Sequence, residues 1–358
     1  MKALLMLENG SCFEGTGFGC EKDTLCEVVF NSAMCGYTEL LTDPSYAGQG
    51  VVMTYPLIGN YGICYDDAES SRPWLSAYIV HRVSDVASNF RADTDLNTFL
   101  KNNSVSGIEN IDTRALTKVL RESGTMKGMI AYGDSVDKEK MIEKIKAYRL
   151  KSLVPQVSCR EPRVYGDGPV KVSLIDYGVK NNIIRSLVSR GCTVKRFPHS
   201  AALEDVMAFD PDGIMLTNGP GDPKECVKEI AELKRIYEHG IPTFAICLGH
   251  QLMALAHGFD TYKLKYGHRG INHPVKRMST GRVYITSQNH GFVVDEKTID
   301  PSVADVSFKS MNDGSIEGLT YKNRKTFSVQ FHPEAAPGPH DTAFLFDRFM
   351  SLMGGERL

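Results

Sequence analysis

The sequence predicts an α/β protein with two domains: a carboxyl-terminal domain on a mostly parallel sheet flanked by helices, and an amino-terminal β-rich β/β/α domain. Three observations support this fold class. A length of 358 residues suits two domains. Short apolar runs alternate with helical patterns after residue 170, as is typical of parallel sheets. Prolines and glycines interrupt residues 151–170, which predicts a linker between domains at 1–150 and 171–358.

The composition is that of an ordinary globular protein, with 42% apolar and 23% charged residues. A net charge of -2 lacks the excess positive charge that binding to nucleic acid or to a membrane surface requires, so neither is expected as a partner. The amino-terminal apolar run is too short for a secretion signal, and no run reaches membrane-spanning length. Nine cysteines without a Cys-x-x-Cys pair argue against disulfides or zinc and predict a reducing, cytoplasmic setting.

The amino-terminal domain begins with strand-like runs and ends in helical ones. β-Branched and aromatic runs predict strands at 26–30, 51–55 and 74–83. Residues 42–46 have the Asp-Pro-Ser chemistry of a turn. Helical patterns predict helices at 138–150, at 94–102, and at 113–122 with Asp112 as N-cap and Gly124 as its stop.

The carboxyl-terminal domain alternates strands and helices. Strands are predicted at 172–175, 193–197, 213–217, 243–246 and 326–331. Helices are predicted at 181–190, 224–239, 341–353 and directly after Cys247. Because ligands of such sheets bind beyond the carboxyl ends of the strands, we expect the functional residues there.

Cys247 falls on the corner between a strand and a helix. The strand at 243–246 is apolar, and Gly249 is expected to let the backbone turn tightly after the cysteine. A strand–turn–helix corner of this kind exposes a nucleophile above the sheet, and a helix amino terminus favours the thiolate. The alternative is a buried cysteine with only a packing role.

Two other strand ends carry residues that suit a cysteine nucleophile. Asn218-Gly-Pro-Gly221 follows a strand and precedes a helix, which favours an oxyanion-binding loop over a plain turn. His332-Pro-Glu334 ends an apolar strand, where residues two apart point to the same side. His332 can therefore act as a base while Glu334 fixes its tautomer.

Other histidines are weaker candidates. His250 competes with His332 for the role of base, but a residue in the first helical turn points along the helix rather than toward the sulfur. His257 lies seven residues after His250 without acidic or cysteine ligands at suitable spacing, so no metal site is expected. No chemistry is assigned to His268, His273 and His290.

Together these motifs resemble a known family. Cys247-Leu-Gly-His-Gln251, the 218–221 loop and His332-Pro-Glu334 resemble the class I (triad) glutamine amidotransferase domain over residues 171–355, which implies a flavodoxin-like sheet. The other segments are similar to the small subunit of carbamoyl phosphate synthetase: Gly36-Tyr-Thr-Glu-Leu-Leu-Thr-Asp-Pro-Ser-Tyr46, Tyr55-Pro-Leu-Ile-Gly-Asn60, Ala87-Ser-Asn-Phe-Arg91, Ile111-Asp-Thr-Arg114 and Ser328-Val-Gln-Phe-His-Pro-Glu-Ala-Ala-Pro-Gly338.

The resemblance implies a role for each site residue. Cys247 would attack the side-chain amide of glutamine to form a thioester, His332 would move the protons, and Glu334 would orient His332. The backbone N–H groups of Leu248 and Gly219 would hold the oxyanion. The glutamine pocket would comprise Ser45 from the amino-terminal domain with Gly219, Gly221, Leu248, Gln251, Asn289, Gly291 and Phe292.

The resemblance also implies a partner. Gly15-x-Gly17-x-Gly19 lacks the spacing of a dinucleotide loop, and no phosphate-loop motif is present, so no cofactor is expected in this chain. This chain would form a heterodimer or higher assembly with the large subunit, and ATP and Mg²⁺ would bind to that subunit. The large subunit would make carbamoyl phosphate from bicarbonate, for pyrimidine and arginine synthesis. No synthetase is expected to be fused to this chain. The alternatives are a stand-alone γ-glutamyl cysteine hydrolase and a non-catalytic regulatory module.

Overall fold

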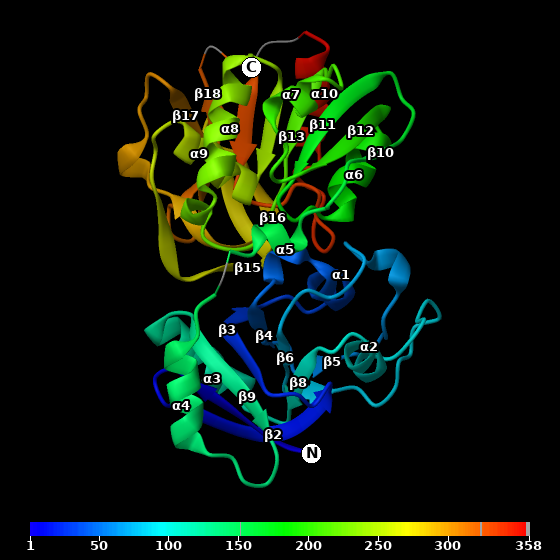
Figure 1. Ribbon diagram of the computed structural model, residues 1–358, viewed down its shortest axis with the longest axis vertical. Helices are drawn as coiled ribbons and strands as arrows, with labels where there is room; N and C mark the ends of the chain where they lie inside the picture. The colour runs from blue at the N-terminus through cyan, green and yellow to red at the C-terminus, as the bar shows by residue number, and fades with distance from the viewer. Residues whose placement is uncertain (151, 323, 356–358) are drawn as a thin grey trace. The chain divides into compact units, whose positions relative to one another are not determined.

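The computed structural model describes residues 1–150, 152–322 and 324–355 (Figure 1). Position 151 of the predicted linker and positions 323 and 356–358 of the predicted second domain lie outside this description. The chain divides into two compact units, Met1–Lys151 with Lys265–Arg269, and Ser152–Leu264 with Gly270–Leu358. None of the described helices has the length and apolar character that crossing a bilayer requires.

The first unit is built on a closed barrel of strand order β1-β2-β8-β6-β4-β3-β9. Its strands are β1 (Lys2–Leu7), β2 (Cys12–Gly19), β3 (Thr24–Asn31), β4 (Gln49–Met53), β6 (Ala77–Ile79), β8 (Ser106–Glu109) and β9 (Met126–Tyr132). A separate parallel pair joins β5 (Leu57–Ile58) and β7 (Arg82–Val83). The helical segments are α1 (Tyr37–Thr42), α2 (Leu96–Asn102), α3 (Thr113–Ser123), α4 (Lys138–Ala147), and the 3-10 turns η1 (Pro44–Tyr46) and η2 (Tyr65–Asp67).

Local chemistry explains these elements. Neighbouring residues of one strand enter different apolar clusters, as the two-residue period of a strand requires: Val28 packs with α3, and Val29 packs with α1 and α2. Asp112 caps α3 by accepting a hydrogen bond from the Ala115 N–H at 2.8 Å, as predicted. Gly124 ends that helix with φ 93°, a conformation that suits glycine.

The second unit is built on a sheet of ten strands in the order β10-β12-β11-β13-β14-β19-β18-β17-β15-β16. Five adjacent strands are parallel: β12 (Cys192–Pro198), β11 (Val170–Asp176), β13 (Gly213–Leu216), β14 (Thr243–Ile246) and β19 (Thr326–Val329). The others are β10 (Arg163–Tyr165), β15 (Thr261–Arg277), β16 (Val283–Val294), β17 (Ala304–Ser310) and β18 (Ile316–Tyr321). The predicted parallel sheet is thus one half of a larger mixed sheet, in which β18 runs antiparallel to both β19 and β17.

Helices cover both faces of the parallel half. Leu203 of α7 (Leu203–Met207), Leu233 of α8 (Val227–Glu238) and Leu252 of α9 (Leu248–Ala256) pack into one cluster. Ile183 of α6 (Asn181–Val188) and Phe349 of α10 (Phe344–Met353) pack into the cluster on the other face. The remaining short segments are α5 (Val154–Val157), η3 (Pro223–Glu225) and η4 (Glu296–Thr298).

The segment predicted as a linker, 151–170, belongs to the second unit where the structure describes it. Val154 of α5 is buried in the same cluster as α8 and α9, and β10 pairs with β12 at the edge of the sheet. The division between the units falls between Lys151 and Ser152. The proline and glycine residues therefore punctuate short elements of the second unit rather than a tether between the two.

Candidate active site

Cys247 lies between the end of β14 and the start of α9, on a strained backbone. Its φ of 53° and ψ of -104° are unusual for a residue with a side chain. The Cys247 N–H donates to the Val329 carbonyl of β19 at 2.9 Å, which holds the bend against the neighbouring strand. The prediction that Gly249 makes the tight turn is wrong, because the strained residue is Cys247 itself. Gly249 serves packing: a Cβ there would lie 2.7 Å from the Leu216 carbonyl oxygen of β13.

His332 and Glu334 follow the end of β19 and are both 2% exposed. The His332 N–H donates to the Ser287 carbonyl of β16 at 2.9 Å, and Nδ1 of His332 lies 2.6 Å from Oε1 of Glu334. Because Nδ1 faces the carboxylate, Nε2 is the ring nitrogen left for the Cys247 sulfur, which is close enough to raise the pKa of the imidazole; Nε2 has no hydrogen-bond partner among the described residues. The structure therefore brings together the three residues that the sequence analysis placed at two distant strand ends.

Strand pairing places these residues side by side. Phe244 of β14 lies opposite Phe327 of β19, and their stacked rings have centroids 4.4 Å apart. In this register Ile246 lies beside Val329. Ile246 immediately precedes Cys247, and Val329 lies three residues before His332, so the two functional residues follow neighbouring strand ends. A slip of one residue would turn every side chain of a strand to the opposite face, so this packing also fixes the triad.

The pKa values of His332 and Glu334 favour the charged form of each side chain. Burial alone would lower the pKa of His332, but the Glu334 carboxylate and Cys247 raise it to about 10. Burial alone would raise the pKa of Glu334, but the Lys180 ammonium and His332 lower it to about 2. A charged imidazole beside a cysteine sulfur is the arrangement of an activated thiol nucleophile.

Lys180, which the sequence analysis missed, completes the charge distribution. Its Nζ donates to Oε1 of Glu334 at 3.0 Å and to the Ala335 carbonyl, and the side chain is 3% exposed. The residue lies just beyond the carboxyl end of β11, at the sheet edge where functional residues were expected. A lysine at a strand end was the available signal, but its partner is 154 residues away in the sequence.

His250 is not placed to act as the base. Its Nδ1 lies 2.7 Å from the Ser328 hydroxyl, and the side chain is fully buried. Burial lowers the pKa of His250 to about 3, so the ring is neutral at physiological pH. His257 also has a local partner, with Nδ1 2.7 Å from the Met253 carbonyl oxygen. His250 within α9 and His257 at its C-cap thus serve the packing of that helix.

The loop after β13 has the form expected for an oxyanion-binding segment. A Cβ on Gly219 would lie 2.3 Å from the Tyr177 carbonyl oxygen and 2.8 Å from Cδ2 of Leu248, so only glycine fits there. Gly221 has φ 95°, the left-handed conformation that favours glycine. Leu248 is the first residue of α9, so its N–H has no partner within the helix and is available for a negative charge.

Of the other predicted pocket residues of this unit, Asn289 of β16 lies beside the sulfur, and Gln251 of α9 is bonded to the same strand. The Cys247 sulfur lies 3.7 Å from the Asn289 carbonyl oxygen. Gln251 donates through Nε2 to the Phe292 carbonyl at 2.8 Å and to Oε1 of Gln330 at 3.0 Å. Gly291 lies between Asn289 and Phe292 on the same strand. His290, which was given no role, bonds Phe292 and Gln288 and so holds this part of β16.

Ser45 belongs to the first unit, where it lies in η1 and is 5% exposed. Its N–H donates to Oδ1 of Asp43 at 2.9 Å, which fixes the turn that was predicted from the Asp-Pro-Ser chemistry. The contact of Ser45 with glutamine stays a prediction, because the other predicted pocket residues belong to the second unit.

Comparisons with known proteins agree with this geometry. Residues 173–352 match the family described as glutamine amidotransferase class-I, and residues 5–130 match the family described as carbamoyl-phosphate synthase small chain, CPSase domain. The chain is 50% identical to the carbamoyl phosphate synthase small chain of Clostridium perfringens, over 98% of this chain and 99% of that protein. It is 48% identical to the small chain of Listeria monocytogenes, over 99% and 98% of the two chains. It is also 48% identical to a pyrimidine-specific small chain of Halalkalibacterium halodurans, over 99% and 97%.

Proposed function

The chain belongs to the family of carbamoyl phosphate synthase small chains, and on that premise we propose that it is the glutamine-hydrolysing subunit of that enzyme. The observation that carries the proposal is the buried Cys247–His332–Glu334 constellation, with the sulfur on a strained strand-to-helix bend. Composition alone gave no sign of this activity, since it is that of any globular protein.

The geometry supports a two-step acyl transfer. The Cys247 sulfur attacks the side-chain amide carbon of glutamine, and the N–H groups of Leu248 and Gly219 receive the negative charge on the amide oxygen. Protonated His332 gives its proton to the departing nitrogen, which leaves as ammonia, and a glutamyl thioester remains on the sulfur. His332 then takes a proton from water, whose oxygen attacks the thioester and releases glutamate and the thiolate.

Glu334 and Lys180 prepare His332 for both steps. The carboxylate holds Nδ1, so the proton is exchanged at Nε2, on the side of the sulfur. Lys180 keeps that carboxylate ionised in a buried site, where an unpaired charge would be costly. Without the lysine, the carboxylate could become neutral and would no longer stabilise the imidazolium.

The ammonia is proposed to pass to a large synthetase chain. Free ammonia is largely protonated in neutral water and no longer nucleophilic, so transfer within the protein preserves its reactivity. The large chain would supply ATP and Mg²⁺ and make carbamoyl phosphate from bicarbonate, in a cytoplasmic heterodimer or higher assembly. Its product would serve pyrimidine synthesis, as the name of the Halalkalibacterium relative states for that protein, and arginine synthesis.

Replacing the nucleophile tests the proposal. The Cys247→Ser variant, combined with the large chain, is expected to lose glutamine-dependent carbamoyl phosphate synthesis by about three orders of magnitude or more, because the sulfur forms the intermediate. Synthesis from added ammonia should remain within about twofold of the wild type, since that reaction needs no thioester. Isotope-labelled bicarbonate measures both rates.

The matched control is Cys192→Ser, which alters another buried cysteine of the same unit at the amino end of β12, the end of the parallel sheet opposite the site. It should keep both activities. Glutamine-dependent synthesis by Cys247→Ser would contradict the nucleophile. Rapid glutamine hydrolysis that is indifferent to the large chain would instead favour the stand-alone hydrolase, and an inactive wild type would favour the regulatory module.

A further inference from the structure

We propose that the partly buried Asp176–Arg196 ion pair is a positioning device for the active site, although neither residue contacts the reacting groups. This inference rests on the proposed glutaminase function. Asp176 is the last residue of β11 and has no exposed surface. Arg196 lies on the adjacent strand β12 and reaches one carboxylate oxygen through two nitrogens: Nε lies 2.8 Å and Nη2 2.5 Å from Oδ2 of Asp176.

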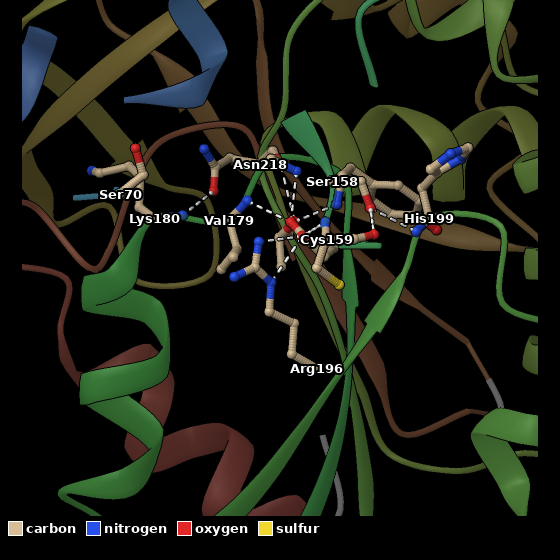
Figure 2. Close-up of polar contacts among 12 residues, drawn as sticks. Ser70, Ser158, Cys159, Val179, Lys180, Arg196, His199 and Asn218 are labelled. Atoms are coloured by element: carbon tan, nitrogen blue, oxygen red, sulfur yellow. Dashed lines mark hydrogen bonds and ion pairs between the residues drawn. The ribbon is translucent and has the colours of Figure 1, made fainter. Parts of the chain in front are cut away.

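Asp176 organises the loop between β11 and α6. Its Oδ1 accepts hydrogen bonds from the Gly178 N–H at 2.9 Å and the Val179 N–H at 2.8 Å, and its Oδ2 accepts one from the Cys159 N–H at 2.6 Å. Figure 2 shows Cys159, Val179 and Arg196 converging on this common acceptor from different segments. The carboxylate therefore fixes the backbone immediately before Lys180.

The loop that Asp176 holds touches two parts of the catalytic machinery. Lys180, one residue after Val179, binds Glu334. The Tyr177 carbonyl oxygen would lie 2.3 Å from a Cβ on Gly219, so this loop closely contacts the proposed oxyanion segment. Hydrogen bonds join the two loops: the Tyr177 N–H donates to the Thr217 hydroxyl at 2.9 Å, and the Lys180 N–H to Oδ1 of Asn218 at 3.3 Å.

One ion pair thus governs the orientation of the base and the position of an oxyanion donor. Catalytic groups tolerate little displacement, and a shift of about 1 Å can cost about a hundredfold in rate. Arg196 matters because it supplies the opposite charge and two of the donors that hold the Asp176 carboxylate in place at the end of β11. Loss of this arginine should therefore disturb catalysis at a distance.

The Arg196→Met variant tests the inference, with Arg190→Met as a matched control. The two arginine side chains are 21% and 23% exposed, and Arg190 pairs with Asp347 at 2.7 Å, away from the 177–180 loop. Glutamine hydrolysis by the full-length chain should fall about tenfold or more in Arg196→Met and stay within about twofold in Arg190→Met, at similar melting temperatures. The acid limb of kcat/KM should also move to higher pH in Arg196→Met only, because a displaced Lys180 no longer depresses the pKa of Glu334.

Equal kinetics and an unmoved pH profile in the two variants would overturn the inference. Should Arg196→Met fail to fold, Arg196→Lys keeps the charge but not the two-nitrogen geometry. It should then lose at least about threefold in kcat with a partial shift of the acid limb, and wild-type behaviour of this variant would equally overturn the inference. A wild-type chain that hydrolyses no glutamine either alone or with the large chain would overturn the proposed function and this inference together.

Discussion

At the scale of single residues, the active site depends on a buried row of alternating charge. Lys180, Glu334 and His332 follow one another in that row, each paired with the next. Each group alone would be costly to bury as an ion, and each is stabilised by its neighbour. The row ends at Cys247, where the positive charge of the imidazolium can meet a thiolate or an oxyanion.

The raised pKa of His332 predicts how stability depends on pH. Because the folded value of about 10 exceeds the ordinary 6.5, His332 stabilises the fold fully below pH 6.5 and loses that contribution as the pH rises through about 10. The loss of unfolding free energy in His332→Asn should therefore be larger at pH 8 than at pH 10. Urea denaturation at the two values measures it.

His250→Asn is the control for this pH series. Burial lowers the pKa of His250 to about 3, so His250 is neutral in both the folded and the unfolded chain well above pH 6.5. The cost of His250→Asn should be the same at pH 8 and at pH 10. A flat series for His332→Asn as well would show that the imidazole is neutral in the native protein.

The sequence was enough to identify the functional residues that lie in recognisable local patterns. Cys247 and His332 each ended an apolar strand, and the parallel sheet implied that such ends meet. Lys180 could not be assigned because its role depends on an ion pair with Glu334, formed only when two distant strand ends come together. The role of Gly249 was misread because tight turning and close packing both select glycine, and only coordinates separate them.

At the scale of elements, α9 and the loop after β13 act as one assembly. Gly219 is in contact with Leu248, the first residue of α9, and the Gly249 N–H donates to the Thr217 carbonyl at 3.0 Å. Both oxyanion donors therefore come from segments that are fastened to each other. Neither can be displaced without moving the other.

This contact predicts a strong effect of a small substitution. Gly219→Ala places a Cβ 2.3 Å from the Tyr177 carbonyl oxygen, so the loop must move and kcat should fall about a hundredfold or more, as for loss of an oxyanion donor. Gly354→Ala is the control, because its Cβ would lie 3.4 Å from the nearest atom and φ is -71°. Steady-state glutaminase assays distinguish them, and comparable rates would argue against Gly219 as a donor.

The elements themselves were predicted unevenly. Buried strands and capped helices of the parallel half have strong local patterns, as β14 and α3 illustrate. The long strand β15 was not predicted, since its residues 262–266 are mostly exposed and lack the alternation of a half-buried strand. β10 was mistaken for linker because a three-residue edge strand gains its stability from pairing with β12 rather than from its own sequence.

At the scale of the whole molecule, the two units are built on different principles. The barrel of the first closes on itself and so has no free edge, whereas the second has an open sheet whose strand ends are accessible for chemistry. The order of the sheet strands could not be predicted from the sequence, because pairing between distant segments is decided by packing.

The cysteines allow a test on the complete chain. All nine are free thiols, including the exposed Cys12 and Cys35. Protein purified without reductant and alkylated in denaturant should therefore carry nine adducts by mass spectrometry. A repeat after reduction is the control, and a higher count after reduction would reveal a disulfide that contradicts the predicted reducing compartment.

The unusual backbone conformation of Cys247 has a consequence for how mutations at this position change the stability of the protein. A side chain in that region of φ and ψ costs about 1–3 kcal/mol, and glycine relieves most of it. Cys247→Gly should accordingly melt several degrees higher than Cys247→Ala, although both lack the sulfur, and identical melting points would refute this. Selection for stability alone would thus favour replacing Cys247 with glycine, so the cysteine at this bend is kept only while its catalytic activity is under selection.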